Sequence, residues 1–123
     1  ECLQILQKLA AANPTSAEAK RDFSVGLIKL GEMQVKAADP PSARRSFEES
    51  LQVARQLAAA NPTSAQVQRD VVVSLVKLAG IEGSGVRWAD ALREMQGMKD
   101  RGVLAPSDER FLEALRQIVA AGK

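Results

Sequence analysis

Few residues in this chain combine types and spacing that suit catalysis. The glycine-rich stretch Gly80–Gly85, GIEGSG, invites comparison with a phosphate-binding loop, but such a loop follows a strand and ends in Lys-Ser/Thr, and neither is present. Glu48-Glu49 and Asp108-Glu109 are adjacent acids, which point about 100° apart on a helix and so do not face one substrate. We interpret the first feature as a helix-ending turn and the acid pairs as surface and capping charges.

The composition removes several further classes of function. The sequence has no His, which takes away the usual general base and metal ligand, and its single Cys2 has no cationic cluster near it in sequence. We therefore expect no enzyme, no cofactor and no metal. A formal charge of +2 with interspersed signs and 3% aromatics argues against nucleic-acid binding. No apolar run is long enough to span a bilayer, so we expect no membrane contact and a soluble, cytoplasmic protein.

A 48-residue internal repeat organises the chain. AAANPTSA at residues 10–17 returns unchanged at residues 58–65, and residues 1–30 share 18 identical positions with residues 49–78. Repeats of 20 to 50 residues are typical of solenoids, in which each unit buries its apolar face on its neighbour. Because residues 1–12 match residues 49–60, the chain starts within a repeat, and we expect it to be a fragment of a longer protein.

Helix signals punctuate this repeat. Asn-Pro at residues 13–14 and 61–62 predicts a helix end with the Asn in the left-handed conformation, and Thr15 with Glu18 and Thr63 with Gln66 have the spacing of capping boxes. Residues of one helical face, nearly all apolar or small, then recur at steps of 3 and 4. They are Phe23, Leu27, Leu30, Gly31 and Gln34; Ala43, Phe47, Ser50, Leu51, Ala54, Leu57 and Ala58; and Trp88, Ala91, Leu92, Met95 and Met98.

Three further points complete the helix prediction. Asp39 is expected to cap the helix that starts at Pro40-Pro41, and Ser107 the last helix, which carries Phe111, Leu112, Leu115, Ile118 and Val119. The β-branched run at residues 71–76 alone would suit a strand. Because its counterpart at residues 23–28 lies between the same cap and the same Lys-Leu, we predict a helix in both copies.

These offsets resemble those of the tetratricopeptide repeat. Leu27, Leu30, Gly31 and Gln34 stand at the family's first-helix positions, with Ala43, Phe47 and Ser50 at its second-helix positions, and Leu75, Leu78, Ala79, Ala91, Met95 and Met98 repeat them. The chain departs from the pattern at Gln34 and Glu82, where the family has Tyr, at Met95 and Met98, and in its period. It is similar to a long-helix bacterial variety, with kinesin-light-chain-like repeats as a neighbouring alternative.

The resemblance implies an all-α, right-handed superhelical solenoid of about six antiparallel helices. Its expected parts form one domain over residues 1–123: a half repeat (1–12), two repeats (15–60 and 63–102) and a capping helix (107–121). The family's function implies a non-catalytic module or scaffold that binds a protein, as a peptide or partner helix, in a concave groove. The alternative is a purely structural spacer or homo-oligomerisation arm within a larger multidomain protein.

In the family, the first helix of each pair lines the groove. The corresponding residues of this chain form two sets. They are Val25, Ile28, Lys29, Glu32, Val35 and Lys36 in the first repeat, and Val73, Val76 and Lys77 in the second. An apolar floor edged by Lys suits a peptide with hydrophobic anchors and an acidic group. The alternative is that the apolar residues only pack between repeats and that Lys29 and Lys77 are solvated charges.

Two other groups of residues are candidate contact surfaces. Leu3, Leu6 and Leu9 form an apolar stripe whose first-helix partner is missing, so we expect some homodimerisation through residues 1–12. Trp88, the only tryptophan, either anchors a partner or seals the gap between the last helices.

Overall fold

The computed structural model describes residues 17–122, and within them the chain is all-α. The helices are α2 (Ala17–Lys36), α3 (Pro40–Ala60), α4 (Ala65–Ala79), α5 (Trp88–Asp100) and α6 (Glu109–Ala120), with a 3₁₀ turn η1 (Pro106–Asp108) before the last. Residues 65–79 are helical, so the helix predicted over the valine-rich run is confirmed. The half repeat at residues 1–12 and Leu3, Leu6 and Leu9 lie outside the described residues, as does Thr15.

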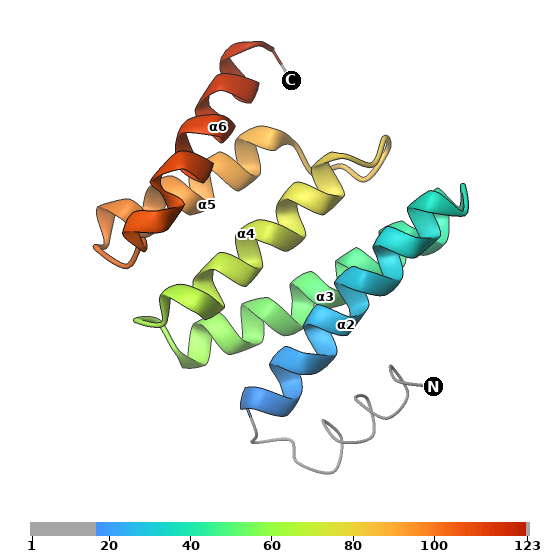
Figure 1. The fold of residues 1–123 in the computed structure, drawn as a ribbon, viewed down its shortest axis with the longest axis horizontal. Coiled ribbons are helices and arrows are strands. Elements are labelled where there is room, and N and C mark those ends of the chain that lie inside the picture. Colours follow the sequence, from blue (N-terminus) through green and yellow to red (C-terminus); the bar gives the residue numbers. More distant parts are fainter. Residues whose placement is uncertain (1–16, 123) are drawn as a thin grey trace.

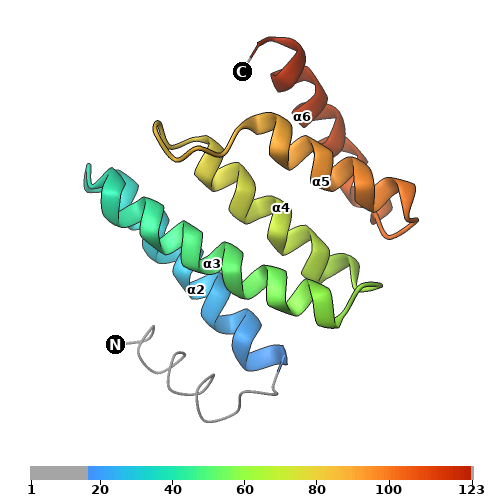
Figure 2. The same ribbon diagram turned by 180° about the vertical axis from the view of Figure 1, so that it is seen from behind.

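The helices pack in chain order. Each contacts the next, and α2 also contacts α4 (Figures 1 and 2). The short connections between helices make successive helices antiparallel neighbours. We call α2 with α3 the first unit and α4 with α5 the second. Within the described residues, no helix is both long and apolar enough to cross a membrane.

The predicted apolar stripes form the core. One cluster joins Ala54 of α3 to residues of α4, α5 and α6, and includes Met95, Met98, Leu112 and Leu115 at no more than 1% exposure. The other joins Ala43 and Phe47 of α3 to Leu78 of α4. The ring of Phe47 lies against Gly31, which is buried. A methyl group added at position 31 would come within 2.8 Å of Phe47 Cζ. The small residue therefore allows α2 and α3 to approach each other.

A buried chain of serine hydroxyls links three helices. Ser24 Oγ of α2 lies 2.9 Å from Ser50 Oγ of α3, which lies 3.3 Å from Ser74 Oγ of α4. Each hydroxyl has a single proton and therefore donates to one acceptor at a time: Ser50 either to a neighbouring hydroxyl or to the Ser24 carbonyl at 3.0 Å, and Ser74 either to Ser50 or to the Asp70 carbonyl at 3.1 Å. Hydroxyls buried in this way remain hydrogen-bonded, so they fix the relative positions of α2, α3 and α4 without leaving polar groups unpaired.

The helix caps partly confirm the sequence prediction. Asp39 caps α3: its side chain accepts from the Ser42 backbone N–H, with prolines in the first turn. Hydrogen bonds from the Ser42 side chain and then its backbone hold the pKa of the Asp39 carboxyl below its usual value. The turn before it closes with Ala38 in the left-handed conformation, at φ 58°.

Three predicted caps are wrong. Ser64 rather than Thr63 caps α4, because its hydroxyl accepts from the Val67 N–H one residue further along than expected. Asn61 is not left-handed; its φ is −134° and its side chain donates to the Leu57 carbonyl. Ser107 makes no cap, because residues 106–108 form a 3₁₀ turn.

Candidate functional site

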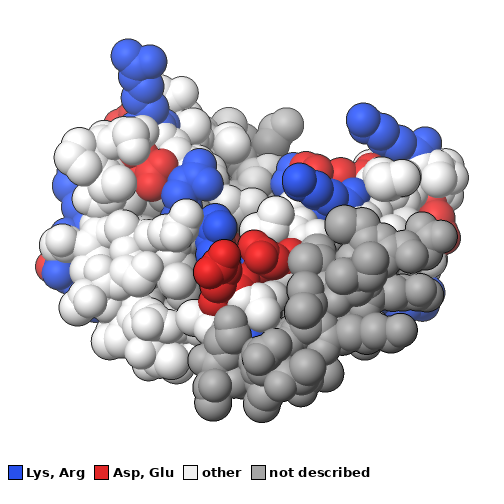
Figure 3. Space-filling view, turned by 60° about the horizontal axis from the view of Figure 1, so that its bottom comes forward, with Lys and Arg blue, Asp and Glu red and all other residues white. Residues whose placement is uncertain are grey.

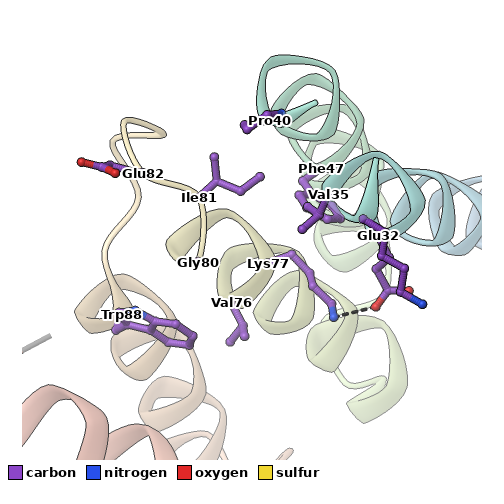
Figure 4. Close-up of a pocket in the computed structure, with 11 residues that line it drawn as sticks. Glu32, Val35, Pro40, Phe47, Val76, Lys77, Gly80, Ile81, Glu82 and Trp88 are labelled. Carbon is purple, nitrogen blue, oxygen red and sulfur yellow. Dashed lines mark ion pairs between the residues drawn. The ribbon is translucent and has the colours of Figure 1, made fainter. Parts of the chain in front are cut away.

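A cleft opens where the α2–α3 turn faces the end of α4. Its volume is about 870 Å³. Figure 4 shows Ile81 and Trp88 on one side, Val35, Pro40 and Phe47 on the other, and Val76 and Lys77 of α4 between them. Val35 is 50% exposed although it is a large aliphatic residue. The lining is therefore mainly apolar and open to solvent, as in sites that bind apolar ligands or side chains.

The α4–α5 loop, residues 80–87, forms one wall of the cleft. Buried Ser84 holds this loop, because its hydroxyl donates to the Leu78 carbonyl at 2.6 Å and accepts from the Val86 N–H at 3.2 Å. Gly83 and Gly85 have positive φ values of 84° and 79°, which side chains rarely adopt. Arg44 of α3 also donates to the Gly83 carbonyl. These contacts position Ile81 and Glu82 at the cleft before any partner binds.

Four charged residues line the cleft, and two of them pair with each other. Lys77 Nζ lies 2.6 Å from Glu32 Oε2, an ion pair that joins α4 to α2. Lys36 and Glu82 also line the cleft and make no ion pair among the described residues. The cleft is therefore balanced in charge, with one paired and one unpaired charge of each sign, so its charge gives no preference for an acidic peptide.

The structure divides the predicted groove residues into two groups. Glu32, Lys36, Val76 and Lys77 line the cleft, as does Val35. The others do not: Ile28 packs against the Phe47 cluster, Val25 and Val73 are half-buried elsewhere, and Lys29 is exposed. The cleft therefore lies toward the ends of α2 and α4 rather than along their whole length.

Several cleft residues were not predicted. Pro40 is the first residue of α3 and Ile81 lies in the α4–α5 loop, whereas Phe47 and Trp88 come from the second helix of each unit. Trp88 also packs against the larger core cluster, so it both covers the core and lines the cleft. The sequence signals were Ile81, an apolar residue within an otherwise small and polar turn, and Trp88, for which one of the two interpretations was a partner anchor.

Charges elsewhere are mixed in sign. On the face drawn in Figure 3, Lys and Arg side chains lie beside Asp and Glu. Over residues 17–122, no three His, Cys, Asp or Glu side chains are placed to hold a metal ion. Comparison of the chain with models of known protein families finds no match, and neither do searches of curated proteins and of solved structures.

Proposed function

We propose that this chain is a tetratricopeptide-like solenoid whose non-catalytic function is to bind a helix of a partner protein in the cleft. The observation that carries the proposal is the pre-positioned apolar cleft between the two units. Its walls come from both units, which are held together by the serine hydroxyls, by core packing and by the Glu32–Lys77 pair. A partner therefore meets a surface that is already ordered, which lowers the entropy cost of binding.

The chemistry of the lining favours a helix over an extended peptide. An extended segment needs partners for its backbone N–H and C=O groups, whereas a helix satisfies them internally. The cleft is walled mainly by Val35, Phe47, Val76, Ile81 and Trp88, and two of its four charged side chains are already paired. The partner helix would present apolar residues at steps of 3 and 4 to these walls.

Two exposed residues of α2 provide a matched test. Peptides selected from a random-sequence library on the wild-type chain would be measured against Val35→Asp and Met33→Asp by fluorescence anisotropy. Both side chains are largely exposed, at 50% and 67%, but only Val35 lines the cleft. We expect Val35→Asp to weaken binding about tenfold or more, because a carboxylate is desolvated against apolar walls, and Met33→Asp to leave it unchanged.

The same measurement can contradict both the cleft assignment and the helical partner. Equal binding by wild type and Val35→Asp, or a loss confined to Met33→Asp, would contradict the cleft assignment. Selected peptides in which apolar residues alternate would contradict a helical partner. Circular dichroism of both variants should match the wild type, because neither exposed side chain contributes to a core cluster.

A rigid spacer is the second candidate, and one observation favours it. Arg21 of α2 pairs with Asp70 of α4 at 2.8 Å, and Arg69 of α4 pairs with Asp108 of η1 at 3.0 Å. Because Arg21 and Arg69 are 48 residues apart, the same repeat position links the first unit to the second and the second unit to η1. A spacer needs this rigidity but no cleft, so peptide selection that yields no binder would favour it. Homodimerisation through residues 1–12, and a larger bacterial parent protein, remain predictions.

A further inference from the structure

A second groove lies between α3 and α5, which flank α4 (Figure 2). Its volume is about 370 Å³, and it shares no lining residue with the cleft. Its apolar floor comes from three segments, as Leu51 of α3, Leu75 of α4 and Val86 of the α4–α5 loop. Its charged lining has a net positive charge, unlike that of the cleft, because it consists of three cations and two acids: Arg55, Arg93, Arg101, Asp90 and Glu94.

Both acids of the groove already have partners. Glu94 pairs with Arg55 across the groove, with 3.4 Å between Oε1 and Nη1. Asp90 accepts from the backbone N–H of Arg87 at 2.9 Å, which caps the start of α5, and lies 3.9 Å from Arg93. Arg101 stands beyond both acids, directly after the last residue of α5. The positive charge that no acid offsets therefore lies at the Arg101 end of the groove.

The fold positions Arg101 without neutralising it. Arg101 Nη2 donates to Gln68 Oε1 at 3.3 Å, and Gln68 is itself held, because its Nε2 donates to the Ala58 carbonyl at 3.1 Å. Gly97 leaves room for the guanidinium, since a methyl group there would lie 3.3 Å from Arg101 Nη1. Within residues 17–122, Arg101 makes no ion pair. Its guanidinium therefore keeps its charge and further N–H donors available for an anion.

We infer that this groove binds an acidic segment of a partner protein, in which a carboxylate lies next to an apolar side chain. The carboxylate pairs with Arg101, and the apolar side chain lies on the floor around Leu75. A free anion would leave this floor uncovered. A purely apolar peptide would take water from the guanidinium without pairing it, which is unfavourable. The lining therefore favours a segment that has both groups.

The place of Arg101 at the helix end makes its charge decisive. It is the C-cap of α5, where the last carbonyl groups carry partial negative charge. An anion at this end is unfavourable unless a cation accompanies it. Without the guanidinium of Arg101, a bound carboxylate would face the negative end of the helix, so removal of this one charge should abolish most of the affinity.

The test uses peptides that depend on Arg101. Peptides from a random-sequence library would be selected on the wild-type chain, depleted on Arg101→Gln and measured by fluorescence anisotropy. We expect the recovered peptides to carry an Asp or Glu beside an apolar residue, and to lose about tenfold or more in affinity when that acid is replaced by its amide. Arg110→Gln is the matched control, because Arg110 is exposed on α6 and lies outside the groove. It should leave the affinity unchanged.

A substitution at Gly97 separates the positioning of Arg101 from stability. Gly97→Ala should raise the urea midpoint, because alanine is the better helix former. The same variant should bind the recovered peptides about threefold or more weakly, because the new methyl group displaces the guanidinium of Arg101. If Gly97 had only a structural role, the midpoint would change and the affinity would not, which would contradict the positioning of Arg101.

Three results would overturn the inference. They are that no peptide survives the depletion, that the survivors are not enriched in acids, or that Arg110→Gln weakens them as much as Arg101→Gln does. The last result would show a general attraction to positive charge. Val35→Asp distinguishes the groove from the cleft and should leave these peptides unaffected. A loss there would place the peptides in the cleft, and would overturn the inference without touching the proposed function.

Discussion

Replacing Phe47 with alanine is expected to lower the free energy of unfolding by about 3–5 kcal/mol, the cost of truncating a large buried aromatic residue. Phe47 is 1% exposed and packs with Ala43 and Leu78, so it joins the two units as well as α2 to α3. Urea unfolding followed by circular dichroism at 222 nm measures the change.

A matched substitution isolates the volume of the ring. Phe47→Met is expected to cost less than half as much, since methionine fills irregular space and the equivalent position of the second unit is Met95, which is fully buried. A loss below about 1 kcal/mol for Phe47→Ala would be typical of a surface residue and would contradict the role given to this side chain.

Gly31→Ala is expected to destabilise the chain even though alanine is the better helix former. The new methyl group would lie within 2.8 Å of Phe47 Cζ, and overpacking of this kind costs about 1–3 kcal/mol. The gain in helix propensity offsets about 1 kcal/mol of this cost. We therefore expect a net loss of up to about 2 kcal/mol in the free energy of unfolding, measured by the same urea titration.

The second unit suggests the compensating change. It has Ala79 and Met95 at the positions of Gly31 and Phe47. In Gly31→Ala with Phe47→Met the flexible side chain yields to the methyl group, so the double variant should be more stable than the sum of the single effects by about 0.5 kcal/mol or more. Additive effects would show that the ring does not constrain position 31.

The fold was largely predictable because its signals are local. Pro62, which follows Asn61, and the glycines between Gly80 and Gly85 disfavour the continuation of a helix, and α3 and α4 end before them. The buried residues of the helices recur with helical periodicity. The choice between Thr63 and Ser64 as cap was not predictable from spacing alone. Both residues have a suitable hydroxyl, and the geometry of the turn after Asn61 selects Ser64.

The site was predictable only in part because it depends on the turns. The resemblance to the tetratricopeptide repeat implied Glu32, Val76 and Lys77 as groove residues, and they do line the cleft. Spacing does not show how residues 80–87 fold back, so Ile81 and Trp88 were not assigned to the same wall. It also does not give the distance between α2 and α4, which is what pairs Lys77 with Glu32 and balances the charge of the cleft.

Trp88 fluorescence provides the most direct measurement of the central claim, that a partner helix binds in the cleft. Trp88 is the only tryptophan of the chain and lines the cleft, so all of the chain's tryptophan emission comes from a residue at that site. Titration with a selected, tryptophan-free peptide should shift the emission to shorter wavelength as the indole loses water, and should saturate at the Kd given by anisotropy. The shift should be absent at the same peptide concentrations for Val35→Asp. Unchanged Trp88 emission while anisotropy shows the peptide bound would contradict the claim.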